Sequence, residues 1–161
     1  MKKYHAVVAG AGIAGMEAAL NLASQGFSVL LVEKEPSIGG NMIALSKVFP
    51  TLDCSSCITT PKMSEAAHSD NIRIMTYTEV TGVQKDGSGF TVRLLKKPRY
   101  VREDICIGCK KCEEVCPVYV KHSFERMTGA RKAICIPFTT AIPQKAVLYP
   151  EDCMQCGKCY D

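Results

Sequence analysis

The spacing of seven cysteines constrains this chain more than any other feature. The seven are Cys106, Cys109, Cys112, Cys116, Cys153, Cys156 and Cys159. The first four form a run with gaps of two, two and three residues, followed directly by Pro117. The last three form a second triplet with gaps of two residues. This is the ligand spacing of a ferredoxin with two 4Fe-4S clusters, in which each triplet wraps one cluster and the fourth cysteine binds the other. Structural zinc sites instead use pairs of Cys-x-x-Cys or Cys/His sets, so the spacing predicts iron-sulfur clusters.

Under the same rule, Cys116 completes a site with the second triplet. The matching fourth cysteine for the first triplet would fall four residues after Cys159, and the sequence stops two residues short of that position, at Asp161. We therefore expect a truncated chain, the front part of a longer protein, in which one cluster lacks its expected fourth ligand. The other thiols that could supply this ligand are Cys54, Cys57 and Cys135.

Composition favours a reducing compartment. Ten cysteines in 161 residues would suit a secreted disulfide scaffold, but the N-terminus has no apolar signal core and the cysteines have cluster spacing. No run approaches the roughly 18 apolar residues of a transmembrane segment. The formal charge of +4 treats the thiolates as neutral, and bound clusters and a pyrophosphate would cancel much of it. We therefore expect a cytoplasmic protein that binds no nucleic acid.

A second motif lies in the first 40 residues. Apolar runs at residues 5–9 and 28–32 flank a helical stretch at residues 13–24, and a Gly-x-Gly-x-x-Gly pattern at residues 10–15 joins the first run to the helix. This order predicts a β-α-β unit that binds a dinucleotide. A glycine-rich structural turn is the alternative.

Each glycine has a role in that prediction. Gly10 permits the tight turn, Gly12 lets a pyrophosphate approach the positive end of the helix, and Gly15 lets the helix press on the strand. Glu33 lies 23 residues after Gly10, where a carboxylate can accept hydrogen bonds from a ribose.

The segment after the second strand favours FAD over NAD. Gly39-Gly40 follows Glu33 by a few residues, which resembles the flavoprotein disulfide-reductase group, whose FAD phosphates lie against that loop. An ordinary turn is the alternative. The predicted FAD-binding residues are Gly10, Gly12, Ala14, Gly15, Glu33, Lys34 and Gly40.

The sequence of residues 47–63 predicts no helix or strand within this segment. The pair Cys54-x-x-Cys57 within them is a redox dithiol, two ligands of a further cluster, or two packed thiols, and the motif alone does not decide. Asp53 beside Cys54 is expected to disfavour the thiolate, which speaks against a reactive nucleophile.

From residue 71 the chain predicts β structure. Alternating runs at residues 72–76, 79–84 and 90–94 surround a turn. The predicted fold class is α/β: a partial Rossmann-like FAD-binding domain at residues 1–98, with an inserted two-cluster ferredoxin module at residues 99–161 that is incomplete at its C-terminus.

Several peptides together resemble one family. They are Gly10 to Gly15, Gly39-Gly40, Phe49 to Cys57, Lys97 to Val101, Cys106 to Pro117, Arg131 to Ile134 and Ile136 to Phe138. Many flavoproteins share the glycine motif, but the Pro-Thr-Leu-Asp-Cys peptide combined with an inserted ferredoxin module is specific to a much smaller group of proteins. Over essentially its whole length, the chain resembles the FAD and iron-sulfur subunit of heterodisulfide reductase, the A-type subunit of that enzyme.

The resemblance implies a thioredoxin-reductase-like core with FAD and two 4Fe-4S clusters, in an oxidoreductase subunit that passes electrons between them, with flavin-based bifurcation of an electron pair. It implies partners that resemble subunits B and C, an electron-donating hydrogenase or dehydrogenase subunit, and ferredoxin. By itself the 161-residue chain is expected to be inactive, and no catalytic residue is assigned. Two alternatives remain: a noncatalytic ferredoxin-type module on a nucleotide-binding scaffold, and a quinone-linked oxidoreductase subunit of the same family.

Overall fold

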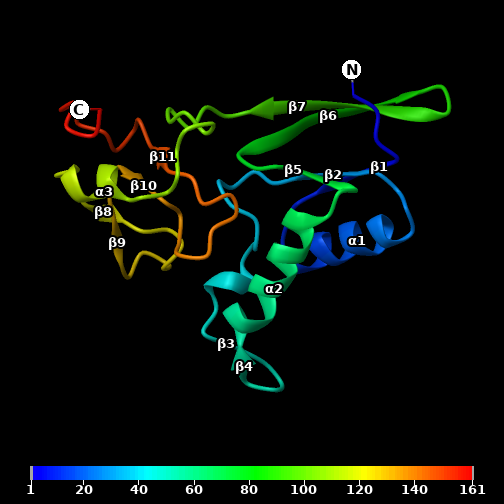
Figure 1. Cartoon of the computed structure of the whole chain (residues 1–161), viewed down its shortest axis with the longest axis horizontal. Helices are drawn as coiled ribbons and strands as arrows, with labels where there is room; N and C mark the ends of the chain where they lie inside the picture. The colour runs from blue at the N-terminus through cyan, green and yellow to red at the C-terminus, as the bar shows by residue number, and fades with distance from the viewer. Residues whose placement is uncertain (1, 161) are drawn as a thin grey trace. The chain divides into compact units, whose positions relative to one another are not determined.

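The computed structural model describes residues 2–160. The chain divides into two compact units, Met1–Lys97 and Pro98–Asp161, and Figure 1 shows the elements of each. The division falls just after the last strand of the first unit, so the glycine motif and the seven spaced cysteines lie in different units.

A three-stranded parallel sheet forms the centre of the first unit. Its strands are β1 (Ala6–Ala9), β2 (Val29–Val32) and β5 (Ile72–Met75), in the order β1-β2-β5. All four residues of the central strand are buried, as expected for a strand with neighbours on both sides and cover on both faces. Because the strands are parallel, their C-terminal ends meet at one edge of the sheet.

Helix α1 (Ile13–Ser24) connects β1 to β2, so the predicted β-α-β unit is confirmed. Its buried residues, Met16, Ala19 and Ala23, lie three and four positions apart and therefore share one face. The chain leaves the helix through Gly26, whose φ of +85° is a conformation that glycine adopts at little cost.

The prediction of no regular element in residues 47–63 is wrong. Strands β3 (Lys47–Val48) and β4 (Asp53–Cys54) form an antiparallel pair there, preceded by the 3-10 helix η1 (Met42–Ala44). Helix α2 (Ser55–His68) begins directly after β4. In Figure 1, α1 and α2 lie below the sheet.

The buried face of α2 explains why the sequence conceals this helix. Ser55, Thr59 and Met63 are buried at intervals of four residues, but the first two are polar. The Ser55 hydroxyl donates to the Met42 carbonyl, and the Thr59 hydroxyl donates to the Ser55 carbonyl at 2.9 Å. Both hydroxyls are therefore satisfied inside the protein, and no apolar stripe is needed. Pro61 lies inside the helix and further weakens the helical pattern.

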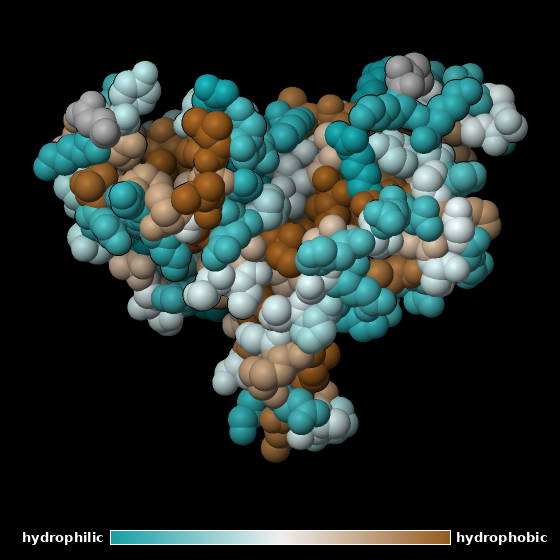
Figure 2. Space-filling model, viewed as in Figure 1, coloured by the Kyte–Doolittle hydropathy of each residue, from teal (hydrophilic) through white to brown (hydrophobic). Residues whose placement is uncertain are grey.

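Two hairpins complete the first unit. Strands β6 (Thr78–Asp86) and β7 (Gly89–Lys96) pair antiparallel, where the sequence predicts two strands and a turn, and they lie above the sheet in Figure 1. The β3–β4 hairpin carries two exposed apolar side chains in its turn, Phe49 and Leu52. Hydrophobic residues are visible on this hairpin at the bottom of Figure 2.

The second unit consists mostly of loops around a small core. Its elements are helix α3 (Lys111–Val115) and the antiparallel pairs β8 (Val120–Lys121) with β9 (Ala130–Arg131) and β10 (Ile134–Cys135) with β11 (Val147–Leu148). A cluster of buried residues forms this core, namely Cys116, Ala133, Ile134, Ile136, Ala141 and Ala146, and Cys135 and Val147 of the β10–β11 pair are buried as well. Units of this size with so few apolar residues are commonly stabilised by bound metal or by disulfides. None of the helices within residues 2–160 is long and apolar enough to span a bilayer.

Candidate cofactor sites

The glycine loop joins β1 to α1 at the C-terminal edge of the sheet. Gly10 has a φ of +97°, a conformation that glycine adopts readily and other residues avoid, and its N–H donates to the Val32 carbonyl at 2.7 Å. A Cβ at Gly15 would lie 1.9 Å from the Gly10 carbonyl oxygen. A larger residue at position 15 would therefore push α1 away from the loop.

The Gly39-Gly40 pair packs directly on this loop. The Gly39 N–H donates to the Ala11 carbonyl at 2.9 Å. Gly40 has a φ of +59°, and a Cβ there would lie 2.7 Å from the Gly12 Cα. Only glycine at position 40 permits such an approach, so the two glycine segments form one backbone-lined surface at the edge where α/β sheets bind dinucleotides.

The start of α1 suits a pyrophosphate. Gly12 is the N-cap residue, and within the described chain neither a side-chain cap nor an acidic residue occupies the first turn. The first N–H groups of a helix have no partner within it and attract phosphate together with the helix dipole. The one atom within 4 Å of a Cβ built at Gly12 is the Gly40 Cα, at 3.9 Å. The residues present therefore fit the pyrophosphate of FAD.

Glu33 is buried at the end of β2, with 5% of its surface exposed. Its Oε2 accepts the N–H of Ala11 at 2.7 Å and its Oε1 accepts the N–H of Glu35 at 2.9 Å. Both carboxylate oxygens have further lone pairs, so this fixed group can also accept hydrogen bonds from the hydroxyls of a ribose. The two remaining predicted residues, Ala14 and Lys34, are exposed beside the loop.

The seven spaced thiols of the second unit divide into two groups, according to which thiols raise the pKa of one another. The first contains Cys106, Cys109 and Cys112, and the second contains Cys116, Cys153, Cys156 and Cys159. Burial raises the pKa of Cys112, and the Glu113 carboxylate and the other thiols of the first group add to this. Burial also raises the pKa of Cys159, with further contributions from the other three thiols of its group. The Cys116 thiol is thus one of those that act electrostatically on Cys159, and the buried cluster to which Cys116 belongs also packs against Cys106, Cys112 and Cys153.

These groups differ from a site for one ion. Within residues 2–160, no three Cys, His, Asp or Glu side chains lie close enough together to hold a single metal ion. An iron-sulfur cube is larger than one ion and needs its thiolates further apart. The all-thiol donor sets fit such a cluster.

The two triplets share a backbone pattern that the sequence analysis missed. In each triplet, two residues have a positive φ, at the second and fourth positions after the first cysteine. In the first triplet these are Gly108 (71°) and Lys110 (65°), and in the second they are Gln155 (57°) and Gly157 (77°). These left-handed residues change the direction of the chain within each triplet. Each triplet has glycine at one of the two positions, but not at the same one, so aligning the triplets with each other would not have revealed the pattern. The Gln155 N–H also donates to the Cys153 Sγ at 3.4 Å.

Cys135 is a buried thiol beside the first group. It is 4% exposed on β10, and burial raises its pKa to about 11, with a smaller contribution from Cys112. Of the three thiols that could supply a further ligand to the first triplet, Cys135 is the one in the same unit.

Cys54 and Cys57 lie at the N-terminus of α2, where Cys54 is the N-cap residue and both are exposed. A hydrogen bond from the Cys57 thiol lowers the pKa of Cys54, and the same interaction raises the pKa of Cys57. The expectation that Asp53 disfavours the Cys54 thiolate is wrong, because the pKa of Cys54 is lowered by hydrogen bonds from Cys57 and from the Ser56 backbone, and Asp53 is not among its causes. Asp53 instead contributes to the raised pKa of Cys57.

This asymmetry predicts a reactivity order. Cys54 should be alkylated by iodoacetamide faster than Cys57 at neutral pH, because its lowered pKa leaves more of it as thiolate. Cys57→Ala removes the hydrogen-bond donor, so the pH profile of Cys54 alkylation should move to higher pH. The rates are measured by peptide mass spectrometry, with Ser56→Ala as the control. An unchanged profile in Cys57→Ala would show that the thiol pair does not govern the Cys54 pKa.

Two family models match the chain, one in each unit. Residues 6–54 match the model described as FAD dependent oxidoreductase, and residues 99–121 match the 4Fe-4S binding domain. Among solved structures, thioredoxin reductase from T. acidophilum is similar, with 28% identity and a TM-score of 0.50 over 56% of this chain and 30% of that chain. The predicted fold class, with a thioredoxin-reductase-like domain and a ferredoxin-type segment, is confirmed.

Curated relatives match nearly the whole chain. The A-type iron-sulfur subunit of CoB–CoM heterodisulfide reductase from Methanocaldococcus jannaschii is 48% identical over 153 residues, 95% of this chain and 23% of the relative. The second A-type iron-sulfur subunit of this enzyme from Methanopyrus kandleri is 54% identical over 138 residues, 86% of this chain and 21% of the relative. The chain thus spans about a fifth of the length of these relatives.

Proposed function

Because the chain belongs to the family of A-type iron-sulfur subunits of heterodisulfide reductase, we propose that it is the part of an electron-transfer subunit that binds FAD and two 4Fe-4S clusters. The proposal rests chiefly on one observation. A single chain combines a backbone-lined dinucleotide loop, in which Gly12 meets Gly40, with two groups of thiols.

In this proposal the first unit holds the flavin. The N–H groups at the start of α1 and the Gly12–Gly40 surface bind the pyrophosphate. The Glu33 carboxylate accepts hydrogen bonds from the ribose hydroxyls. Gly10 and Gly15 hold the loop against the helix. Ala14 and Lys34 border the same surface as its exposed residues. FAD supplies the exchange between two-electron and one-electron steps.

The second unit holds the clusters. Cys116 and the second triplet supply four thiolates to one cluster, and the first triplet supplies three to the other. The loop residues with positive φ shape both sites, and the Gln155 N–H donates a hydrogen bond to the Cys153 sulfur. Residues 99–161 then act as a ferredoxin module inserted into the flavin domain of residues 1–98.

The partners follow from the relatives. The names of the relatives describe subunits of CoB–CoM heterodisulfide reductase. We therefore propose a cytoplasmic complex with subunits that resemble B and C, with a hydrogenase or dehydrogenase subunit as electron donor, and with ferredoxin as a further partner on the low-potential branch. Bifurcation of electron pairs at the flavin belongs to the same proposal. The isolated chain should not reduce a heterodisulfide, because its proposed role is electron delivery.

Reconstitution tests the cofactor assignment. We expect the chain, loaded anaerobically with iron, sulfide and excess FAD, to bind FAD with visible flavin absorbance and to give the electron paramagnetic resonance (EPR) signal of a reduced 4Fe-4S cluster after dithionite treatment. Four thiolates should make the Cys116 cluster robust, whereas the first triplet should give a labile or three-iron cluster. Iron content and EPR spectra distinguish these forms.

The alternatives give different results. A noncatalytic ferredoxin-type module would assemble clusters and bind no FAD at saturating concentration. Two equally stable four-iron clusters would show that a further ligand, such as Cys135, completes the first site. Failure to bind both FAD and iron would reject the proposed function.

A further inference from the structure

Two lysines donate hydrogen bonds to the backbone of proposed cluster ligands. The Lys132 Nζ donates to the Cys116 carbonyl at 2.6 Å, and the Lys145 Nζ donates to the Cys106 carbonyl. Both interactions are partly buried. Since Cys116 lies in the second thiol group and Cys106 in the first, each group has its own ammonium.

A second contact holds Lys132 in place. Its Nζ lies 3.4 Å from the centroid of the Tyr119 ring, a cation–π geometry that stabilises a positive charge. Tyr119 follows Cys116 by three residues, so one short segment without regular structure presents both the carbonyl and the ring. The ammonium is therefore fixed at the loop of the cysteine.

Resting on the proposed function, we propose that Lys132 is a positioning residue that acts through the Cys116 loop to raise the reduction potential of the cluster held by Cys116 and the second triplet. Reduction adds one negative charge to a cluster. A fixed positive charge in a partly desolvated site stabilises that added charge more than a mobile surface lysine does. Net charge and hydrogen bonding near the sulfurs are recognised determinants of cluster potentials. Lys145 acts in the same way at the Cys106 loop.

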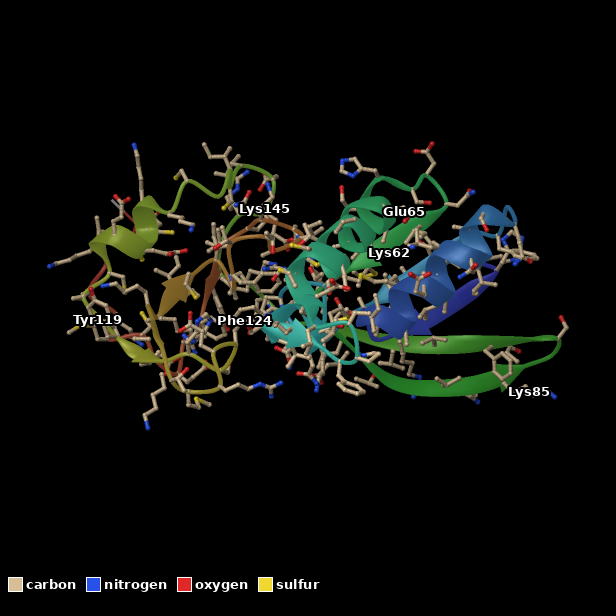
Figure 3. The ribbon with its side chains drawn as sticks, turned by 90° about the horizontal axis from the view of Figure 1, so that it is seen from below. Lys62, Glu65, Lys85, Tyr119, Phe124 and Lys145 are labelled. Carbon is tan, nitrogen blue, oxygen red and sulfur yellow. The ribbon has the colours of Figure 1, made fainter. Side chains whose placement is uncertain are left out.

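The spatial separation of the two lysines provides a matched control. Figure 3 labels Tyr119, on which Lys132 packs, and Lys145, and the two labelled residues lie well apart within the second unit. Lys132→Gln and Lys145→Gln each remove one charge and leave an amide donor. They alter the net charge of the protein equally but affect different cysteine loops.

The test is an EPR-monitored redox titration of the reconstituted chain. Lys132→Gln should lower the potential of the Cys116 cluster by the equivalent of about a tenfold change in its reduction equilibrium, roughly 59 mV for one electron. Lys132→Arg keeps the charge and should retain most of the wild-type potential. Lys145→Gln should shift this cluster much less. Lys132→Met, neutral and of similar length, repeats the measurement if the glutamine variant loads poorly.

Each outcome has one meaning. A loaded cluster with unchanged potential in Lys132→Gln would overturn the inference and leave the proposed function intact. Equal shifts in Lys132→Gln and Lys145→Gln would also overturn it, because net charge alone would explain them. Loss of the cluster in both neutral variants, with retention in Lys132→Arg, would assign Lys132 to assembly and reject the tuning role. A wild-type chain without a cluster would instead reject the proposed function.

Discussion

Cys116→Ala should abolish the robust 4Fe-4S cluster of the reconstituted chain. Cys116 belongs to the first cysteine run, but its thiol contributes to the raised pKa of Cys159 in the second triplet. Without it, three thiolates remain, two of which, Cys156 and Cys159, are exposed to solvent. We expect the EPR signal of this cluster to fall below about a tenth of the wild-type intensity, or to change to that of a three-iron form, because each 4Fe-4S cluster requires four ligands.

Cys135→Ala is the matched control for this prediction. Both cysteines are buried in the second unit, with 8% of Cys116 and 4% of Cys135 exposed. Each substitution removes one sulfur and costs about 1 kcal/mol or more in transfer and cavity terms. The Cys135 variant should nevertheless retain the robust cluster, because Cys135 lies near Cys112 in the first group. Equal retention by both variants would show that Cys116 is not a ligand.

The β-α-β unit was predictable because each of its features is local. The apolar runs, the glycine spacing and Glu33 all lie within the first 40 residues, and each glycine acts through the backbone of its own loop. The contact between Gly12 and Gly40 was harder to predict. It depends on how the loop after β2 folds back, and no periodic pattern describes that path.

Helix α2 shows where sequence reasoning fails. Its buried face uses Ser55 and Thr59, whose hydroxyls find carbonyl partners only in the folded structure. Pattern analysis treats such residues as solvent-facing, and Pro61 strengthens that error. The Cys54 pKa was mispredicted for the same reason. The charge of Asp53 is visible in the sequence, whereas the hydrogen bond from Cys57 exists only because Cys54 is the N-cap residue of α2 and Cys57 lies on its first turn.

The ferredoxin-type unit was predicted from ligand spacing alone, since almost nothing else in it is periodic. Spacing predicted the pairing of Cys116 with the second triplet, and the ligand roles remain predictions that reconstitution must test. Lys132 and Lys145 carried no sequence signal, because they lie 16 and 39 residues from the carbonyls that they contact. Contacts of this range depend on the folded loops.

Gly12→Val should weaken FAD binding strongly while the fold persists. Gly12 has an ordinary φ of −74°, and a Cβ there would meet only the Gly40 Cα, at 3.9 Å, so the protein itself accommodates a Cβ at this position. The proposed pyrophosphate occupies this space. A branched side chain should therefore cost about 1–3 kcal/mol of binding free energy, a roughly 5- to 150-fold higher Kd.

Fluorescence titration of FAD against the reconstituted chain measures the effect, and circular dichroism reports the fold. Gly82→Val is the matched control, because a Cβ at Gly82 also has its nearest neighbour at 3.9 Å, the Arg93 Cδ, on a hairpin away from the loop. Gly40→Ala is unsuitable, since its Cβ would lie 2.7 Å from the Gly12 Cα and would disturb the loop even without a ligand. If Gly12→Val bound FAD as tightly as Gly82→Val, the pyrophosphate would not lie on Gly12, and the start of α1 would lose its proposed role.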